Sequence, residues 1–80
     1  MEKVKQKIND LLGEIIDPQI EITGDKLLIT DCQLDSLKIM KLMSMIEDEF
    51  DLLIPVNKIM HIQSIDDLYN AVSEYLKVAA

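Results

Sequence analysis

Apolar residues that recur at helical spacing, interrupted by two prolines, are the feature that most limits how this chain can fold. Within residues 2–16 the apolar side chains follow steps of three and four, as on one face of an α-helix. They are Val4, Ile8, Leu11, Leu12 and Ile15. Pro18 and Pro55 end such patterns, because the residue before a proline is pushed out of the α region. The spacing therefore predicts an all-α fold.

The periodicity predicts a four-helix bundle with a short third helix and a long loop between the first two helices. The helices are expected at 2–16, from Asp35-Ser36 to about Phe50, at about Asn57–His61, and from an N-cap at Ser64 to about Lys77. The second helix has a stripe of apolar residues along one face, made of Ile39, Leu42, Ile46 and Phe50. The corresponding stripe of the last helix is made of Ile65, Leu68, Tyr69, Val72 and Leu76. Leu37, Met40, Met43 and Met45 lie off the second stripe, so that helix is apolar on more than one face.

Residues 17–35 form a long connection without helical period. Such a length is uncommon unless the segment packs its own apolar groups or carries function. Thr23-Gly24-Asp25 is a turn signal within it. We expect Ile20, Ile22 and all of Leu27–Ile29 to pin this connection across the bundle.

Composition limits the function classes. A length of 80 residues allows one domain, residues 1–80. The formal net charge of −7, with eight lysines and no arginine, argues against nucleic-acid binding and favours partners with basic surfaces. Cys32 is the single cysteine, so a disulfide scaffold is excluded. With no long apolar run and no signal-peptide pattern, we expect a cytoplasmic protein with no membrane span, and a monomer.

Residues for catalysis or metal binding are scarce. His61 is the single histidine, and we expect it on the surface. A zinc site needs several Cys or His ligands, and a phosphate-binding loop needs more glycines than Gly13 and Gly24. The run Glu47-Asp48-Glu49 points in several directions on a helix and is interpreted as a solvated face. We therefore predict no catalytic residue, no metal site and no enzyme activity.

The pair Asp35-Ser36 opens a helix after the long connection and has two interpretations. The first is a plain N-cap, whose side chain accepts a bond from an unpaired backbone N–H. The second is that Ser36 carries a phosphodiester-linked group, since a helix N-terminus favours negative charge. No base adjoins Ser36 in the sequence, so another enzyme would have to catalyse its modification.

Taken together, the motifs resemble the acyl carrier protein family. The matching elements are Asp35-Ser36-Leu37, Ile46-Glu47-Asp48-Glu49-Phe50-Asp51, Ile54-Pro55 and Ile62-Gln63-Ser64-Ile65. The resemblance covers essentially the whole chain and is strongest between residues 34 and 68.

The resemblance implies that Ser36 bears 4′-phosphopantetheine, attached by a phosphopantetheinyl transferase that uses coenzyme A and magnesium. The terminal thiol of this arm would hold acyl or aminoacyl groups as thioesters. An acyl- or aminoacyl-loading enzyme would charge the arm, and downstream synthase, condensing or transferase enzymes would take up its cargo. Cys32 is not that thiol and is expected to be a partly buried small apolar residue.

The family's partner face is its second helix with the short third one. Carried over to this chain, it comprises Asp35, Leu37, Met40, Ser44, Glu47 and Asp48. For Met40 the alternative is simple core filling. A sequestered acyl chain would enter the interior near Ile46, Ile54, Ile59, Ile62 and Leu68.

Two departures from the fatty-acid type concern this face. Lys38 and Lys41 stand where typical members carry acids. The usual Gly-x-Asp-Ser-Leu is here preceded by Cys32-Gln33-Leu34, without glycine, a form similar to stand-alone carriers of nonribosomal peptide, polyketide and D-alanyl systems. A specialised carrier is favoured over a housekeeping fatty-acid carrier, and an unmodified helical interaction module is the alternative from another class.

Overall fold

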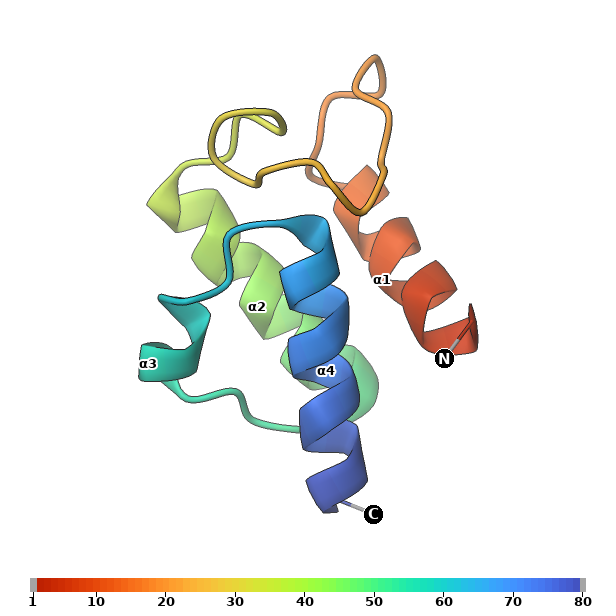
Figure 1. Cartoon of the computed structure of the whole chain (residues 1–80), viewed down its shortest axis with the longest axis vertical. Helices are drawn as coiled ribbons and strands as arrows, with labels where there is room; N and C mark the ends of the chain where they lie inside the picture. Colours follow the sequence, from red (N-terminus) through yellow and green to blue (C-terminus); the bar gives the residue numbers. More distant parts are fainter. Residues whose placement is uncertain (1, 80) are drawn as a thin grey trace.

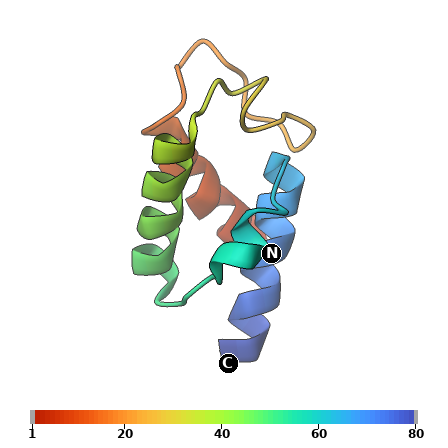
Figure 2. The same cartoon turned by 90° about the vertical axis from the view of Figure 1, so that its left-hand side faces the viewer.

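The computed structural model describes residues 2–79, with side chains up to residue 76, and it is all-α as predicted. Its helices are α1 (Glu2–Gly13), α2 (Ser36–Phe50), α3 (Val56–Ile59) and α4 (Ile65–Ala79). The long connection crosses one end of the bundle, where α2 and α4 begin (Figure 1). α3 lies on the side between α2 and α4 (Figure 2). Within the described residues, no helix has the length and apolar character needed to cross a membrane.

Four helix boundaries differ from the predicted ones, among them the end of α3 at Ile59 instead of about His61, while the predicted start and end of α2 are confirmed. α1 ends at Gly13, because residues 14 and 15 close tighter turns onto Leu11 and Leu12. α3 begins at Val56, one residue early, because Pro55 holds its φ at −60° and so starts the turn. α4 continues two residues beyond Lys77.

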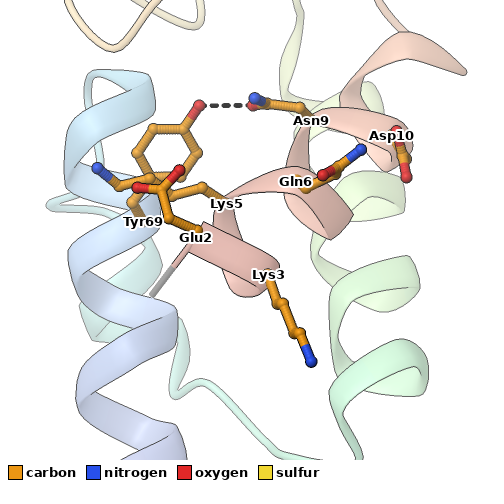
Figure 3. Close-up of a pocket in the computed structure, with 7 residues that line it drawn as sticks. All are labelled: Glu2, Lys3, Lys5, Gln6, Asn9, Asp10 and Tyr69. Carbon is orange, nitrogen blue, oxygen red and sulfur yellow. Dashed lines mark hydrogen bonds between the residues drawn. The ribbon is translucent and has the colours of Figure 1, made fainter.

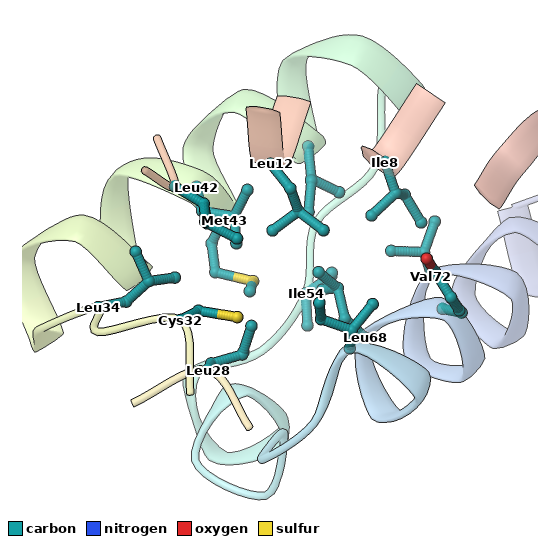
Figure 4. Packing of buried hydrophobic residues seen from close by; sticks show 14 of the residues in the cluster. Ile8, Leu12, Leu28, Cys32, Leu34, Leu42, Met43, Ile54, Leu68 and Val72 are labelled. Carbon is teal, nitrogen blue, oxygen red and sulfur yellow. The ribbon is translucent and has the colours of Figure 1, made fainter. Parts of the chain in front are cut away.

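The core is a cluster of aliphatic side chains to which α1, α2, α4 and the connection contribute. Its fully buried members include Ile8, Leu12, Leu28, Leu42, Met43, Ile46, Ile65, Leu68 and Val72. In Figure 4, Leu28, Cys32 and Leu34 of the connection point towards Met43 of α2. Met43 was predicted to lie off the stripe, yet it is only 1% exposed, because the connection covers that second face of α2.

The connection is fastened to the start of α4 by backbone hydrogen bonds. The N–H of Leu28 donates to the Gln63 carbonyl over 2.9 Å, and the N–H of Ile65 donates to the Lys26 carbonyl over 3.0 Å. Asp66 N–H likewise donates to the Gly24 carbonyl over 2.9 Å. A Cβ at Gly24 would collide with the Asp66 carboxylate, so glycine permits this close approach.

The prediction that Leu27, Leu28 and Ile29 all anchor the connection is wrong for two of them. Only Leu28 is buried, whereas Leu27 is 42% and Ile29 66% exposed. Leu27 forms an isolated antiparallel bridge with Ser64. Directly after this bridge the backbone turns, with the N–H groups of Asp31 and Cys32 both donating to the Leu27 carbonyl, and the turn directs only Leu28 into the core. Ile20 and Ile22 do pack against the core, half-buried.

One aromatic side chain joins α1 to α4. The Tyr69 hydroxyl donates to Asn9 Oδ1 over 2.5 Å, and the Lys5 ammonium lies 5.4 Å from the centre of the Tyr69 ring (Figure 3). Burial raises the pKa of Tyr69, which keeps this hydroxyl protonated and able to donate. The tyrosine therefore adds a directional contact to an interface that is otherwise aliphatic.

A capping box starts α4. Asp67 Oδ2 accepts the backbone N–H groups of Ser64 (3.1 Å) and Gln63 (3.0 Å), and Ser64 Oγ accepts the Asp67 N–H over 3.1 Å. The two bonds to the carboxylate hold the pKa of Asp67 below its usual 3.8. This confirms the predicted cap at Ser64.

We expect Asp67→Asn, which keeps one acceptor oxygen but removes the charge that strengthens both hydrogen bonds, to lower the free energy of unfolding by about 1 kcal/mol at neutral pH. Because the folded-state pKa is lowered, the carboxylate's contribution is complete above its usual pKa and is lost as pH falls through the lowered value. The difference between wild type and variant should therefore narrow below about pH 4, measured by urea unfolding. Asp66→Asn is the matched control, in the same first turn but outside the capping box. An equal loss in both variants would contradict the capping role.

Candidate functional site

Ser36 is the first residue of α2 and is exposed to solvent. Asp35 before it is extended (φ −97°, ψ 178°) and acts as N-cap: its Oδ1 accepts the Lys38 N–H over 2.8 Å. The Asp35 carbonyl accepts the Ile39 N–H over 2.9 Å. The N-cap interpretation of the Asp35-Ser36 pair is confirmed, and it is compatible with the second interpretation, because the cap leaves the Ser36 hydroxyl to the solvent.

The residues before the cap hold it in place. Leu34 is buried, and its N–H donates to the Leu28 carbonyl over 3.0 Å. Gln33 has a φ of 60°, in the left-handed region that favours glycine. This is where the Gly-x-Asp-Ser-Leu pattern of the family has its glycine. Gln33 therefore adopts the left-handed conformation at the position where the family pattern has glycine.

The surroundings of Ser36 suit a phosphodiester. A helix N-terminus offers unpaired backbone N–H groups and a favourable dipole to negative charge. Within the described part of the chain, no side chain hydrogen-bonds the Ser36 hydroxyl, and Asp35 is engaged as the cap. No cluster of His, Cys, Asp and Glu that could hold a metal ion occurs among those residues. The site can present a hydroxyl to an external enzyme and does not itself activate it.

Cys32 is more deeply buried than expected, at 2% exposure, although it was predicted to be only partly buried. Burial is the main cause that raises the pKa of its thiol, with a smaller contribution from Asp31. It therefore remains a protonated, inaccessible core group. His61 is exposed, as predicted.

The outward face of α2 combines apolar and charged groups. Leu37 is 81% and Met40 47% exposed, so the core-filling alternative for Met40 is wrong. The exposed polar residues of this face are Lys38, Lys41, Ser44 and Asp48. The charge on the helix is therefore divided, with lysines near Ser36 and acids towards the far end.

Glu47 has a structural role that the sequence did not reveal. It is half-buried, and its Oε2 accepts the Ile54 N–H over 3.1 Å, which ties the segment after α2 back to the helix. The same segment exposes Leu53, the first residue of α3 exposes Val56, and the turn after α3 exposes Met60. None of these three exposed apolar side chains was predicted, because a short linker has no period from which its burial can be read.

The five residues named for an acyl chain all belong to the core cluster or pack against it. Ile46, Ile54 and Leu68 are buried members, whereas Ile59 and Ile62 are half-buried and pack against the cluster. Their use by an acyl chain stays a prediction.

Comparison with known proteins decides the family. A sequence profile described as a phosphopantetheine attachment site matches residues 2–72. The chain belongs to this family, the acyl carrier proteins. It is 28% identical over 74 residues to an acyl carrier protein of Borreliella burgdorferi, covering 91% of this chain and 92% of the relative. An acyl carrier protein of Thermobifida fusca is 28% identical over 75 residues, with 88% and 95% covered.

Solved structures agree with this assignment. A putative acyl carrier protein from Mycobacterium tuberculosis superposes with a TM-score of 0.84 at 30% identity, covering 90% of this chain and 97% of the other. For an acyl carrier protein from Thermotoga maritima the TM-score is 0.83 at 24% identity, with 99% and 93% covered, a likeness of fold. The protein is thus a non-catalytic carrier of phosphopantetheine and depends on a phosphopantetheinyl transferase and on pathway enzymes.

Substitutions at Asp35, the N-cap of α2, test whether its side-chain hydrogen bond stabilises the start of the helix. Asp35→Ala removes the acceptor of the Lys38 N–H and should lower the free energy of unfolding by about 0.5–2 kcal/mol. Asp35→Asn keeps an acceptor oxygen, so its loss should be clearly smaller. Urea unfolding of the unmodified chain measures both. Equal losses would contradict a capping role and point to the carboxylate's charge.

Proposed function

We propose that Ser36 is the attachment residue and that the chain, as one carrier domain of residues 1–80, delivers thioester-bound acyl or aminoacyl groups between enzymes. The observation that carries this proposal is the exposed Ser36 hydroxyl in the first turn of α2, beside a cap that leaves it unengaged. The buried Leu34 and the hydrogen bonds of Asp35, which both precede Ser36, fix the position of the Ser36 backbone.

The attachment chemistry places little demand on this chain. Ser36 Oγ attacks the phosphorus of coenzyme A that bears the pantetheine. A Ser–O–P bond forms, the pyrophosphate P–O bond breaks, and the adenosine bisphosphate half leaves. The serine proton passes to the transferase, and magnesium bound by that enzyme balances the phosphate charge. What α2 supplies is a helix N-terminus that favours the resulting negative phosphodiester.

Intact mass measurement tests the attachment. Incubation with a broad-specificity transferase, magnesium and coenzyme A should add one phosphopantetheinyl unit to the wild type and none to Ser36→Ala. Ser44→Ala, an exposed serine two turns further along α2, is the matched control and should be modified like the wild type. A folded sample that several transferases leave unchanged would favour the unmodified interaction module instead.

The outward face of α2 is proposed as the surface on which partner enzymes dock. Exposed Leu37 and Met40 supply a small apolar centre next to the attachment residue. Lys38 and Lys41 flank it, and Asp48, together with the partly engaged Glu47, lies further along. A face of this size suits transient contacts, in which charge steers encounter more than it adds affinity.

This division of charge supports a specialised polyketide, nonribosomal peptide or related pathway over housekeeping fatty-acid synthesis. A partner with a uniformly basic docking surface would meet Lys38 and Lys41 at the end of α2 where the arm is attached. Like charges in that position lower the rate of association and disfavour the complex. The pathway enzymes proposed for this chain therefore present acidic groups near the arm.

A charge reversal tests this assignment. With a ketoacyl-carrier synthase of fatty-acid synthesis, the wild type should turn over poorly, and Lys38→Asp plus Lys41→Glu should raise kcat/KM by about tenfold, since removing repulsion of about 1.4 kcal/mol has that effect. Lys3→Asp, on α1, makes half of this charge change away from the α2 face and should have little effect on kcat/KM. Efficient turnover by the wild type, unimproved by the reversal, would overturn the specialised assignment.

A further inference from the structure

The residues of α2 that lie farthest from the core form one row along the helix. Positions 37, 41, 44 and 48 follow steps of four, three and four, which places them on one side, opposite the buried Leu42 and Ile46. All four side chains are exposed, and α2 lies at one edge of the molecule (Figure 2). We call them the outer row: Leu37, Lys41, Ser44 and Asp48.

The charges of α2 are separated along its length. From Ser36 to Ile46 the charged side chains are two lysines, whereas residues 47–51 contain four acids and no base. Within the outer row, Lys41 represents the first half and Asp48 the second, about 10 Å further along the helix. Neither takes part in an ion pair among the described residues. Each is therefore available to a charged group from outside the chain.

A second copy of the same chain has the complementary order of charges when its α2 runs antiparallel. A two-fold axis midway between Lys41 and Asp48 brings each lysine level with the aspartate of the other copy. Ser44 lies beside this axis, and its small side chain lets the helices approach to about 8–10 Å, the usual distance between packed helices. A parallel arrangement would instead place like charges side by side.

Exposed apolar side chains also come together in the antiparallel arrangement. Leu37 begins the outer row and is 81% exposed. It then lies near the far end of the other copy's α2, where Leu53 follows the helix and is equally exposed. Contact between them removes apolar surface from water at both ends of the pair.

From this arrangement we infer that two copies of the chain associate through the outer row of α2 as an antiparallel, two-fold symmetric pair. Lys41 of each copy forms an ion pair with Asp48 of the other. The inference goes beyond the proposed function, and it needs neither the arm nor a partner enzyme. It bears on that function because pairing covers the face proposed for docking, so a paired carrier has to separate before an enzyme binds there.

The pair is weak and reversible. The 15 residues of α2 extend about 22 Å, which limits the contact to the smallest interface class. The net charge of −7 on each copy opposes association, although physiological salt screens exposed charges that lie more than about 8 Å apart. We expect a dissociation constant of about 0.1–1 mM, so a dilute chain is a monomer, as the sequence predicts.

Sedimentation equilibrium of the unmodified chain at an ionic strength of about 0.15 M tests the pair. Lys41→Glu should raise the dissociation constant by about tenfold or more, because two acids then face each other. Asp48→Lys should weaken the pair as much, although it makes the net charge less negative. Both substitutions in one chain should restore association, and so should an equal mixture of the two single variants. Lys3→Glu, on α1, changes the net charge as Lys41→Glu does and should have little effect.

Three results would overturn the inference. The first is a wild type that stays monomeric up to about 2 mM, which would leave the face of α2 to partner enzymes alone. The second is stronger association of Asp48→Lys, since net charge instead of a specific ion pair would then control it. The third is association that neither single substitution alters, which would place the contact elsewhere on the molecule. Circular dichroism of each variant verifies that these exposed substitutions leave the helices intact, and none of the results depends on attachment at Ser36.

Discussion

The hydrogen-bonded junction between residues 24–28 and the start of α4 is the constraint on which the rest of the structure depends. It fixes a long connection whose buried side chains, Leu28, Cys32 and Leu34, complete the core. Leu28 lies at its centre, since its N–H binds the α4 side and its carbonyl binds Leu34. The position of the Asp35 cap, and with it that of Ser36, follows from those two bonds. A carrier needs its attachment residue in a reproducible place at a surface that enzymes can reach, and this junction supplies both.

Local chemistry explains which parts of the fold could be predicted. The start of α2 was correct because an N-cap depends on neighbouring residues alone, and Asp35 satisfies it with a bond to Lys38. Helix period likewise placed Leu42, Ile46 and Leu68 in the core. The outward side chains of Leu27 and Ile29 could not be predicted, because the pairing of Leu27 with Ser64 sets which side of that segment faces the core. The same holds for Met43, which is buried only because the connection covers it.

The motif that contains Ser36 could be predicted from the sequence better than the surface around it. Family resemblance pointed to Ser36 and to the α2 face, and the exposure of Leu37 and Met40 agrees with that expectation. The half-burial of Glu47 was not foreseen, since the hydrogen bond that it accepts from the Ile54 N–H depends on how the segment after α2 folds back.

Gln33 shows how this carrier keeps the family's geometry with a different residue. A φ of 60° costs a residue with a Cβ about 1 kcal/mol or more relative to glycine. Burial of Cys32 before it and Leu34 after it over-determines that conformation and offsets the strain. Glycine would relieve the strain, but it would also leave a bare backbone next to Ser36. The exposed Gln33 side chain instead adds a neutral hydrogen-bonding group three residues before Ser36. Glutamine in place of glycine at position 33 therefore changes the surface near Ser36 and leaves the fold unchanged.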